Sequence, residues 1–164
     1  MNNSLKIFVL LLILPLCCLG ANVPNTGGIT PAVNIDQARV IATVRKAESY
    51  IKKYGKEKAI IEFRKNSNDI FMGDYNGMFF VSPLHPELIG KNQFNYKDPS
   101  GALVVQEEIE KAKAGGGWLK GRWRKNPQTG EYQCRKIYIL PTPGNYFIGS
   151  WYHYSSNKQG VCLI

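Results

Sequence analysis

Residues 118–155, WLKGRWRKNPQTGEYQCRKIYILPTPGNYFIGSWYHYS, decide the fold because they predict three consecutive strands. Three stretches rich in aromatic and β-branched residues, WLKGRWR, YQCRKIYIL and NYFIGSWYHYS, are separated by two segments whose Asn, Pro and Gly residues favour turns. Strands joined by short turns are usually neighbours in one sheet. The sequence therefore predicts an antiparallel meander at this end of the chain.

The cations of the first stretch have a second interpretation, as part of a flexible basic arm for nucleic acid. Alternation along a strand instead places three of them on one face, which we expect to be solvated: Lys120, Arg122 and Arg124. A nucleic-acid-binding arm requires no such alternation, and two further strands in hairpin register seldom follow one. We therefore predict a strand here and no nucleic acid as a partner.

The first twenty residues have the layout of a secretory signal peptide. A single cation, Lys6, precedes an apolar run over residues 7–19, and small residues near its end predict cleavage after Gly20. The run is shorter than the roughly twenty residues that span a bilayer, which disfavours a stable membrane anchor. Lipidation is the weaker alternative, because Leu16 rather than a small residue precedes Cys17. We expect a periplasmic or secreted protein.

The rest of the chain has the length and charge expected of one exported domain. Residues 21–33 contain Pro, Gly, Asn and Thr without an apolar period and predict a flexible leader. Loss of Lys6 leaves twenty Lys and Arg against twelve Asp and Glu, a formal charge of +8 that favours anionic partners. We expect Cys134 and Cys162 to form a disulfide in an oxidising compartment, with two buried free thiols as the alternative.

Two helices are predicted before the first strand. Asn34 is a candidate cap for a helix of about twenty residues, whose inward residues recur at steps of three or four: Ile41, Val44, Ala47, Ile51 and Tyr54. Gly55 ends this helix. The segment KEKAIIEFRKN then predicts a shorter helix that turns Ile60 and Phe63 inward.

A strand pair, a long loop and a third helix follow. IFMGDY and MFFVS flank an Asn-Gly pair at residues 76–77, which favours a tight hairpin. The connection over residues 83–101 is long for a plain connection, and loops of this length are usually either functional or disordered. Asp98 and Pro99 are a candidate cap and first-turn residue for a helix over ALVVQEEIEKAKA, which three glycines end.

The order of these elements and a series of motifs resemble the single Cache domains of bacterial extracytoplasmic sensors, in particular the second single-Cache family. The motifs are NGMFFVSPLHPELIGKN, KDPSGALVVQEEIEKAKAGGGWLKGRWRKNP, RKIYI and YFIGSWY, in the order and spacing of the family. The resemblance implies an α+β fold, a PAS-like antiparallel sheet of about five strands with a long amino-terminal helix packed across it. It assigns residues 34–155 to this domain and 156–164 to a carboxyl-terminal tail.

The resemblance also implies a function. Members of the family bind small molecules, often acids such as acetate, propionate or pyruvate, in a pocket between the sheet and the loop before the third helix. They usually pass the signal to a kinase or a chemoreceptor. We expect this chain to be a stand-alone exported sensor domain that binds a small organic acid and signals through a partner, such as a membrane receptor.

Five residues are candidates for contacts with this ligand. Lys136 and Tyr138 share one face of the strand YQCRKIYIL and match a basic and a tyrosine position of the family, with Arg135 as an alternative counterpart of Lys136. Trp123 matches the family's tryptophan and is either a pocket wall or a core residue. Ser82 takes the place of a family histidine and either binds ligand or caps the turn before the next proline.

Three departures from the family support a second hypothesis. Ser82 replaces a histidine, Gly121 replaces a tyrosine and Trp151 replaces a frequent glycine. If these changes fill the pocket, the protein is an interaction scaffold with a degenerate pocket, which docks an acidic partner or an anionic surface through the basic face of its first meander strand.

No motif indicates catalysis or a cofactor. The sequence has no nucleophile elbow, no helical histidine pair with a glutamate and no phosphate-binding glycine loop. The glycines at residues 115–117 end a helix, whereas a phosphate loop starts one. His85 and His153 have no acidic or cysteine ligand at metal-site spacing. We expect no enzymatic activity, no cofactor and no metal.

Overall fold

The protein is described by a computed structural model that covers residues 34–67, 69–156 and 160–162. The signal peptide and leader expected for residues 1–33 lie outside the described residues, as does part of the carboxyl-terminal tail. None of the described helices is long and apolar enough to cross a membrane.

Two consecutive helices open the described chain, as predicted. α1 spans Ile35–Tyr54, and the Asn34 side chain caps it by accepting hydrogen bonds from two amides of the first turn. Gly55, with a φ of 84°, ends α1, and α2 follows over Lys56–Asn66.

The buried face of α1 differs in part from the predicted one. The buried residues recur at steps of four, three and four and form one stripe along the helix: Val40, Val44, Ala47 and Ile51. Ile41 is only half-buried and Tyr54 is 42% exposed, so the prediction of these two as inward residues is wrong. In α2, Ala59 and Phe63 are buried and Ile60 is partly buried.

Within the described residues, six strands form one antiparallel sheet, where about five were expected. They are β1 (Phe71–Asp74), β2 (Phe79–Val81), β3 (Gly117–Trp118), β4 (Arg122–Lys125), β5 (Tyr132–Pro141) and β6 (Tyr146–Tyr154). Their order is β2-β1-β6-β5-β3, and β4 also pairs with β5. The long strands β5 and β6, both from the meander, form the middle of the sheet.

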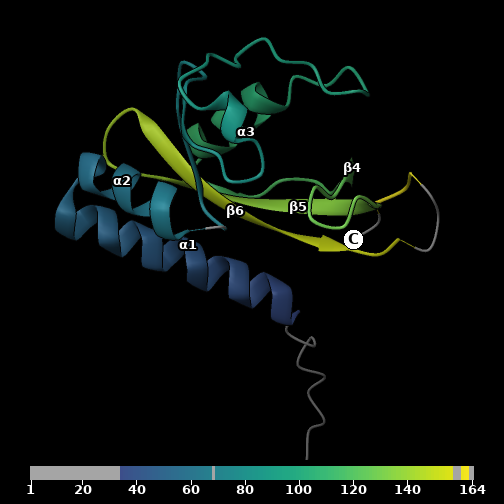
Figure 1. Ribbon diagram of the computed structural model, residues 1–164, viewed down its shortest axis with the longest axis horizontal. Helices are drawn as coiled ribbons and strands as arrows, with labels where there is room; N and C mark the ends of the chain where they lie inside the picture. Colours follow the sequence, from purple (N-terminus) through teal and green to yellow (C-terminus); the bar gives the residue numbers. More distant parts are fainter. Residues whose placement is uncertain (1–33, 68, 157–159, 163–164) are drawn as a thin grey trace, which may run out of the picture. The chain divides into compact units, whose positions relative to one another are not determined.

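The sheet separates two layers of helices (Figure 1). α1 and α2 cover one face and pack on residues such as Leu140 and Ile148. α3, which spans Val104–Lys113, covers the other face and packs on residues such as Ile139 and Phe147. Because side chains alternate along a strand, sequence neighbours on β5 belong to different layers. The predicted α+β class, with a long helix across an antiparallel sheet, is confirmed.

Glycines occupy two tight positions around the long loop and α3, one in the turn between β1 and β2 and one directly after α3. Gly77, with a φ of 88°, lies in the Asn-Gly turn between β1 and β2, where Asp74 Oδ1 accepts two backbone amides. The long loop that follows contains one short 3-10 helix, η1, over Pro86–Leu88. After α3, a Cβ atom at Gly116 would lie 2.6 Å from the carbonyl oxygen of Ile139, so this crossing requires glycine.

The predicted strand WLKGRWR is divided into β3 and β4, which accounts for the sixth strand. Gly121 lies in the interruption. A Cβ atom at this position would overlap with the hydroxyl group of Tyr154 and would lie 3.2 Å from the Cβ atom of Cys162. The space that a tyrosine would need at position 121 is therefore occupied by the end of β6 and by the carboxyl-terminal segment.

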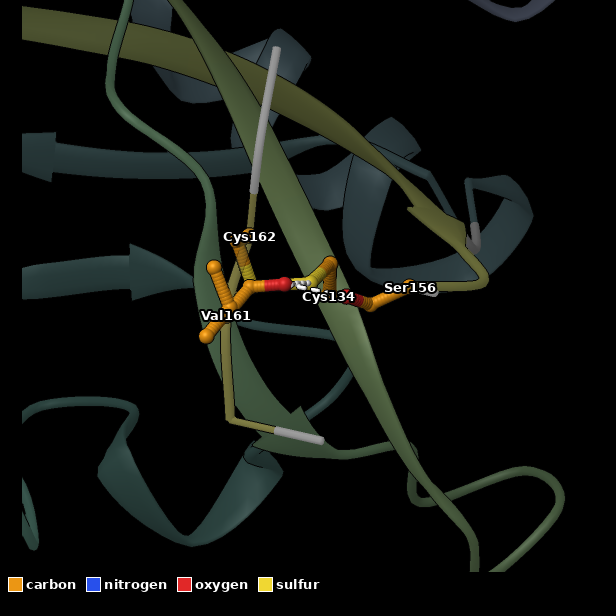
Figure 2. Close-up of a disulfide and its surroundings, with 4 residues drawn as sticks. All are labelled: Cys134, Ser156, Val161 and Cys162. Atoms are coloured by element: carbon orange, nitrogen blue, oxygen red, sulfur yellow. Dashed lines mark hydrogen bonds between the residues drawn. A yellow bond between two sulfur atoms is a disulfide. The ribbon is translucent and has the colours of Figure 1, made fainter. Parts of the chain in front are cut away.

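The carboxyl-terminal segment returns to β5 after β6 ends (Figure 2). The sulfur atoms of Cys134 and Cys162 lie 2.06 Å apart, the length of a disulfide bond, and their Cα atoms lie 5.5 Å apart. The Ser156 hydroxyl also donates a hydrogen bond to the carbonyl group of Val161. These contacts hold the segment against the strand beside Gly121.

We predict that Gly121→Ala destabilises the domain by about 1–3 kcal/mol, because the added methyl group meets the Tyr154 hydroxyl in a packed site. Chemical denaturation measures the loss. The Tyr154 hydroxyl is buried without a hydrogen-bond partner among the described residues, so Tyr154→Phe alone should be nearly neutral. The double variant should recover most of the lost stability, and equal losses in the single and double variants would contradict the assignment.

Candidate ligand-binding site

A cavity of about 1000 Å³ lies on the face of the sheet that α3 covers. The long loop between β2 and α3 and the carboxyl-terminal segment also contribute to its lining. Its apolar lining comes from the sheet, the loop and the helix: Phe71, Phe79, Leu84, Val105, Ile137 and Trp151. A cavity of this size and polarity is suited to a small organic ligand.

Arg135 on β5 brings a positive charge to this lining. Among the described residues, no carboxylate oxygen lies within 4.0 Å of its guanidinium nitrogens, and none accepts a hydrogen bond from them. Burial lowers the pKa of Arg135, and the Glu108 carboxylate partly opposes this effect. An arginine keeps its charge under these conditions, so the cavity contains a cation without a direct partner.

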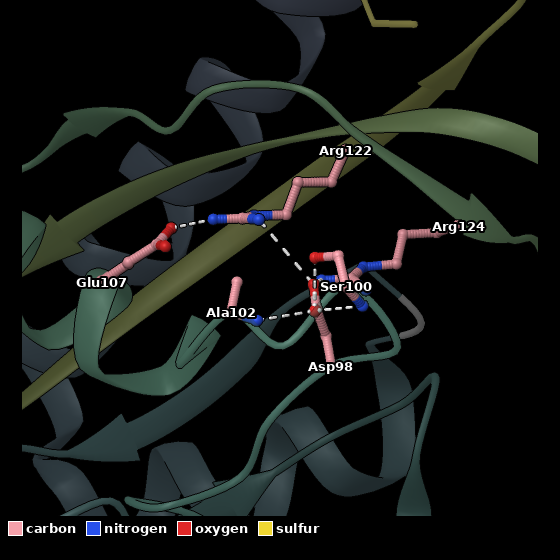
Figure 3. Close-up of polar contacts among 6 residues, drawn as sticks. All are labelled: Asp98, Ser100, Ala102, Glu107, Arg122 and Arg124. Atoms are coloured by element: carbon pink, nitrogen blue, oxygen red, sulfur yellow. Dashed lines mark hydrogen bonds and ion pairs between the residues drawn. The ribbon is translucent and has the colours of Figure 1, made fainter. Parts of the chain in front are cut away.

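The two arginines of β4 are in a different situation, since acidic side chains pair with both (Figure 3). Arg124 Nη2 donates to Asp98 Oδ2 at 2.6 Å, and Arg122 Nη1 lies 3.7 Å from the same oxygen. Arg122 also donates a hydrogen bond to Glu107 on α3. Two carboxylates therefore neutralise two guanidinium groups, and the prediction that this face is solvated is wrong. Of its three cations, Lys120 is the one classed as exposed.

Asp98 is the centre of this network. Its Oδ1 atom accepts hydrogen bonds from the Ser100 hydroxyl, the Ser100 amide and the Ala102 amide. Burial by itself would raise the pKa of Asp98, but the hydrogen bonds from Ser100 and Ala102 and the Arg124 guanidinium together hold this pKa well below its usual range. The carboxylate thus remains charged and joins the long loop to β4.

The predicted role of Asp98 as the cap of α3 is wrong. The helix begins at Val104 with Leu103 at the capping position, where no side chain of a described residue caps it. Asp98 instead closes the turn that precedes the helix by accepting a hydrogen bond from the Ala102 amide. Its other carboxylate oxygen pairs with the arginines of β4. The sequence pattern Asp-Pro before an apolar helix did not distinguish these two uses.

Glu108 is another charged residue of the cavity lining that has no direct partner among the described residues. It lies on the buried face of α3 and is 8% exposed, and its Oε2 atom has no hydrogen-bond partner among the described residues. Burial raises the pKa of Glu108 to about 7, although Arg135 and Arg124 act in the opposite direction. Sequence analysis did not select Glu108, but its place among Val105, Ile109 and Ala112 in the apolar stripe of α3 was an available signal.

Lys136 and Tyr138 do not line this cavity. Side-chain alternation along β5 turns them away from α3, since Arg135 and Ile137 occupy the cavity side. The Lys136 ammonium lies 5.6 Å from the centre of the Trp118 ring, and the Tyr138 and Trp118 ring centres lie 5.1 Å apart. The two residues do share a face, as predicted, but it is the face that α1 and α2 cover.

The other three candidates, Arg135, Ser82 and Trp123, all contribute to the lining. Ser82 is 6% exposed, and its hydroxyl makes no hydrogen bond to another described residue. Trp123 pairs with Cys134 across the strands, and its ring stacks on Tyr132 with the centres 6.3 Å apart. In the sheet, Trp123 is therefore opposite Cys134, whereas the residue opposite Arg135 is Arg122.

Trp151 and Gly121, two positions that depart from the pattern noted in the sequence, both belong to the lining of the cavity. Trp151 is 8% exposed, lines the cavity and packs on Phe71 with ring centres 6.1 Å apart. Gly121 lies beside the carboxyl-terminal segment, which forms another part of the lining. Among the described residues, no group of three His, Cys, Asp or Glu side chains is arranged to hold a metal ion.

Comparison with known proteins identifies a family and a fold. The model of the family described as Single Cache domain 2 matches residues 36–150. The sensor histidine kinase MctS of Rhizobium johnstonii is 41% identical over 70 residues, which are 43% of this chain and 15% of the kinase. The chain therefore corresponds to a small part of that relative.

Solved structures of chemotaxis sensors share the fold. A methyl-accepting chemotaxis protein from Vibrio parahaemolyticus is 20% identical with a TM-score of 0.60, over 71% of this chain and 87% of that one. A Cache chemosensory domain whose structure is titled for carboxylic acid recognition is 21% identical with a TM-score of 0.62, over 73% and 93%. At these identities the likeness concerns the fold.

We predict that Asp98→Asn destabilises the domain by about 3–5 kcal/mol at pH 7, because it leaves Arg124 without its carboxylate and removes one of the two carboxylates near Arg122. The folded state lowers the pKa of Asp98, so this contribution is complete at neutral pH and is lost as the pH falls below about 4. Urea denaturation between pH 3 and pH 7 measures both effects.

The exposed ion pair of Asp36 with Arg39 provides the control, since Asp36→Asn should cost less than about 1 kcal/mol. A difference between wild type and Asp98→Asn that stays constant from pH 7 to pH 3 would contradict the assignment.

Proposed function

The chain belongs to the Single Cache domain 2 family and is a Cache sensor domain, and we propose that its cavity binds a small organic acid. In this proposal the Arg135 guanidinium receives the carboxylate of the ligand. The apolar side chains of the cavity contact the rest of the ligand, and no chemical turnover is involved.

The observation that carries the proposal is the state of Arg135. Arg135 is partly buried, and a guanidinium group that has lost part of its hydration without a direct partner is stabilised when an anion approaches it. At a separation near 4 Å and an effective dielectric constant near 20, a carboxylate offers roughly 4 kcal/mol before its own desolvation is subtracted. Arginine also presents two parallel N–H groups that match the two oxygens of a carboxylate.

Ser82 adds a polar contact to the same proposal. Its buried hydroxyl lines the cavity and is not used by another described residue, so it is free to donate a hydrogen bond to the ligand. The structural neighbour with carboxylic acid recognition in its title supports the same ligand class. The cavity of about 1000 Å³ also admits acids larger than the three-carbon ones.

The alternative function, an interaction scaffold with a basic docking face, has less support. Its proposed docking face consists of Lys120, Arg122 and Arg124, and carboxylates of the same chain already pair with the two arginines. Its other premise was a filled pocket, whereas the described residues enclose a large cavity. Both observations therefore favour a sensor over a scaffold.

We further propose that the domain works outside the cytoplasm, in the periplasm or as a secreted protein, after cleavage of a signal peptide at Gly20. Signalling then requires a partner that reads the ligand-bound state, such as a membrane receptor. The sensor histidine kinase relative and the chemotaxis neighbours are consistent with this kind of partner. An oxidising compartment would also allow the bond between Cys134 and Cys162 to form.

We predict that Arg135→Ala weakens acid binding at least about 30-fold, because it removes the charged partner of the carboxylate. A thermal-shift panel of acids with two to six carbons first identifies a ligand, since binding to the folded state raises the unfolding midpoint. Calorimetric titration of that ligand then compares the variants.

Lys136→Ala is the matched control, because it removes the neighbouring cation of β5 on the opposite face of the sheet and should change affinity less than about twofold. A flat panel with folded wild-type protein would overturn the proposed function. Equal losses in both variants would remove Arg135 as the specific contact.

For the exported protein we predict one disulfide and no free thiol after removal of residues 1–20. Intact mass after alkylation, with and without prior reduction, measures this. Replacing both Cys134 and Cys162 by Ser should lower the free energy of unfolding by about 3–4 kcal/mol, as expected for a bond that closes a sequence separation of 28 residues. Two alkylated thiols in the unreduced protein would contradict the proposal.

A further inference from the structure

We propose that Glu108 makes the cavity selective for acids that also carry a hydrogen-bond donor, such as a hydroxyl or an ammonium group, over plain acids of the same size. This inference rests on the acid site proposed for Arg135 and specifies its ligand class. It assigns Glu108 the role of a second polar contact for the ligand.

Glu108 is a buried residue. It lies in the apolar stripe of α3, where its neighbours Val105, Ile109 and Ala112 pack on the sheet. Its side chain is 92% removed from solvent, as the residue is 8% exposed, and it lines the cavity. A carboxyl group in such a position is unfavourable unless its oxygen atoms find donors.

The described part of the chain provides no hydrogen-bond donor for one of the two carboxyl oxygens of Glu108. Glu108 Oε2 has no hydrogen-bond partner among the described residues. Arg122 and Arg124 are engaged by Glu107 and Asp98, as described above. No nitrogen atom of Arg135 lies within 4.0 Å of a Glu108 oxygen, so the two unpaired groups line the same cavity without touching.

The Arg135 guanidinium and the Glu108 carboxyl group are together complementary to one kind of ligand. A molecule that places its carboxylate at Arg135 and a donor at Glu108 satisfies both. A plain acid satisfies only Arg135 and leaves Glu108 without a donor. Sites with buried polar groups reject analogues that leave those groups unpaired, and this is a stronger form of discrimination than shape.

The protonation state of Glu108 distinguishes a site in which Glu108 accepts a hydrogen bond from the ligand from one in which Glu108 donates a hydrogen bond to the ligand. With a pKa near 7, raised by burial, the group is available in both forms at neutral pH. The ionised form offers an ammonium group a negative charge and two acceptor oxygens, whereas the protonated form has an O–H group that could donate to the carboxylate of a plain acid. The charged groups that act on it come from β5, β4 and α3: Arg135, Arg124, Arg122 and Glu107. The preceding loop and the β3–β4 connection add Tyr96, Asp98 and Lys120 to the lining.

The test uses two series of acids that differ only in the donor. The three-carbon series is propionate, lactate, 3-hydroxypropionate, alanine and β-alanine, and the six-carbon series is hexanoate, 2-hydroxyhexanoate, 2-aminohexanoate and 6-aminohexanoate. Calorimetric titration at pH 8, where Glu108 is largely ionised, measures each affinity. We expect at least one donor-bearing acid to bind about 10- to 100-fold more tightly than its plain analogue.

Variants then assign the discrimination to Glu108. Glu108→Leu should reduce the ratio between that acid and its plain analogue to less than about twofold, because it removes the acceptor and retains an apolar side chain. Glu108→Gln should retain part of the preference for a hydroxyl and lose the preference for an ammonium group. Glu110→Gln, an exposed position of the same helix, should leave the ratio unchanged. Circular dichroism and the unfolding midpoint verify that each variant is folded.

A pH series from 6 to 8 gives a readout that packing alone would not change. Affinity for the donor-bearing acid should rise with pH as Glu108 ionises, and this rise should be absent in Glu108→Leu. The inference is overturned if plain acids bind as tightly as donor-bearing ones, or if affinity falls with pH because Glu108 donates to a plain carboxylate. Those results would leave the acid site at Arg135 intact, whereas failure of every acid to bind folded wild-type protein would overturn both proposals.

Discussion

The ion pair between Asp98 and Arg124 determines which charges the cavity presents. It joins the long loop to β4 and, together with the contacts of Arg122, uses two acidic groups to neutralise two cations. Without it, the lining would contain several competing arginines and the loop would lose its ion pair to β4. Because these groups satisfy one another, they are not available in the way that Arg135 and the buried Glu108 are, which line the cavity without a direct partner among the described residues.

The side chains of the central strand β5 alternate between two faces of the sheet that have different neighbours. Arg135 and Ile137 point toward α3 and the cavity, whereas Lys136 and Tyr138 point toward the layer of α1 and α2. Lys136 is accommodated there by the Trp118 ring, which offers a cation a favourable surface without a counterion. Adjacent cations on one strand therefore have different surroundings, an aromatic ring for Lys136 and the cavity for Arg135.

The carboxyl-terminal segment links the architecture of this chain to the shape of its cavity. Gly121 leaves room for Tyr154 and Cys162, and the segment that ends with Cys162 contributes to the lining. Trp151 adds aromatic surface from β6. The residues at these positions therefore belong to the wall of the cavity.

The sequence by itself determined the elements and the fold, because caps, turn glycines and apolar periods are local signals. Asn34, Gly55 and the meander residues placed α1, its end and the central strands correctly. Only the tertiary structure decided which β5 cation faces the cavity, that Asp98 pairs with arginines instead of capping α3, and that Glu108 joins the site. Alternation shows which residues share a face, but the partner of that face is set by contacts between elements distant in sequence.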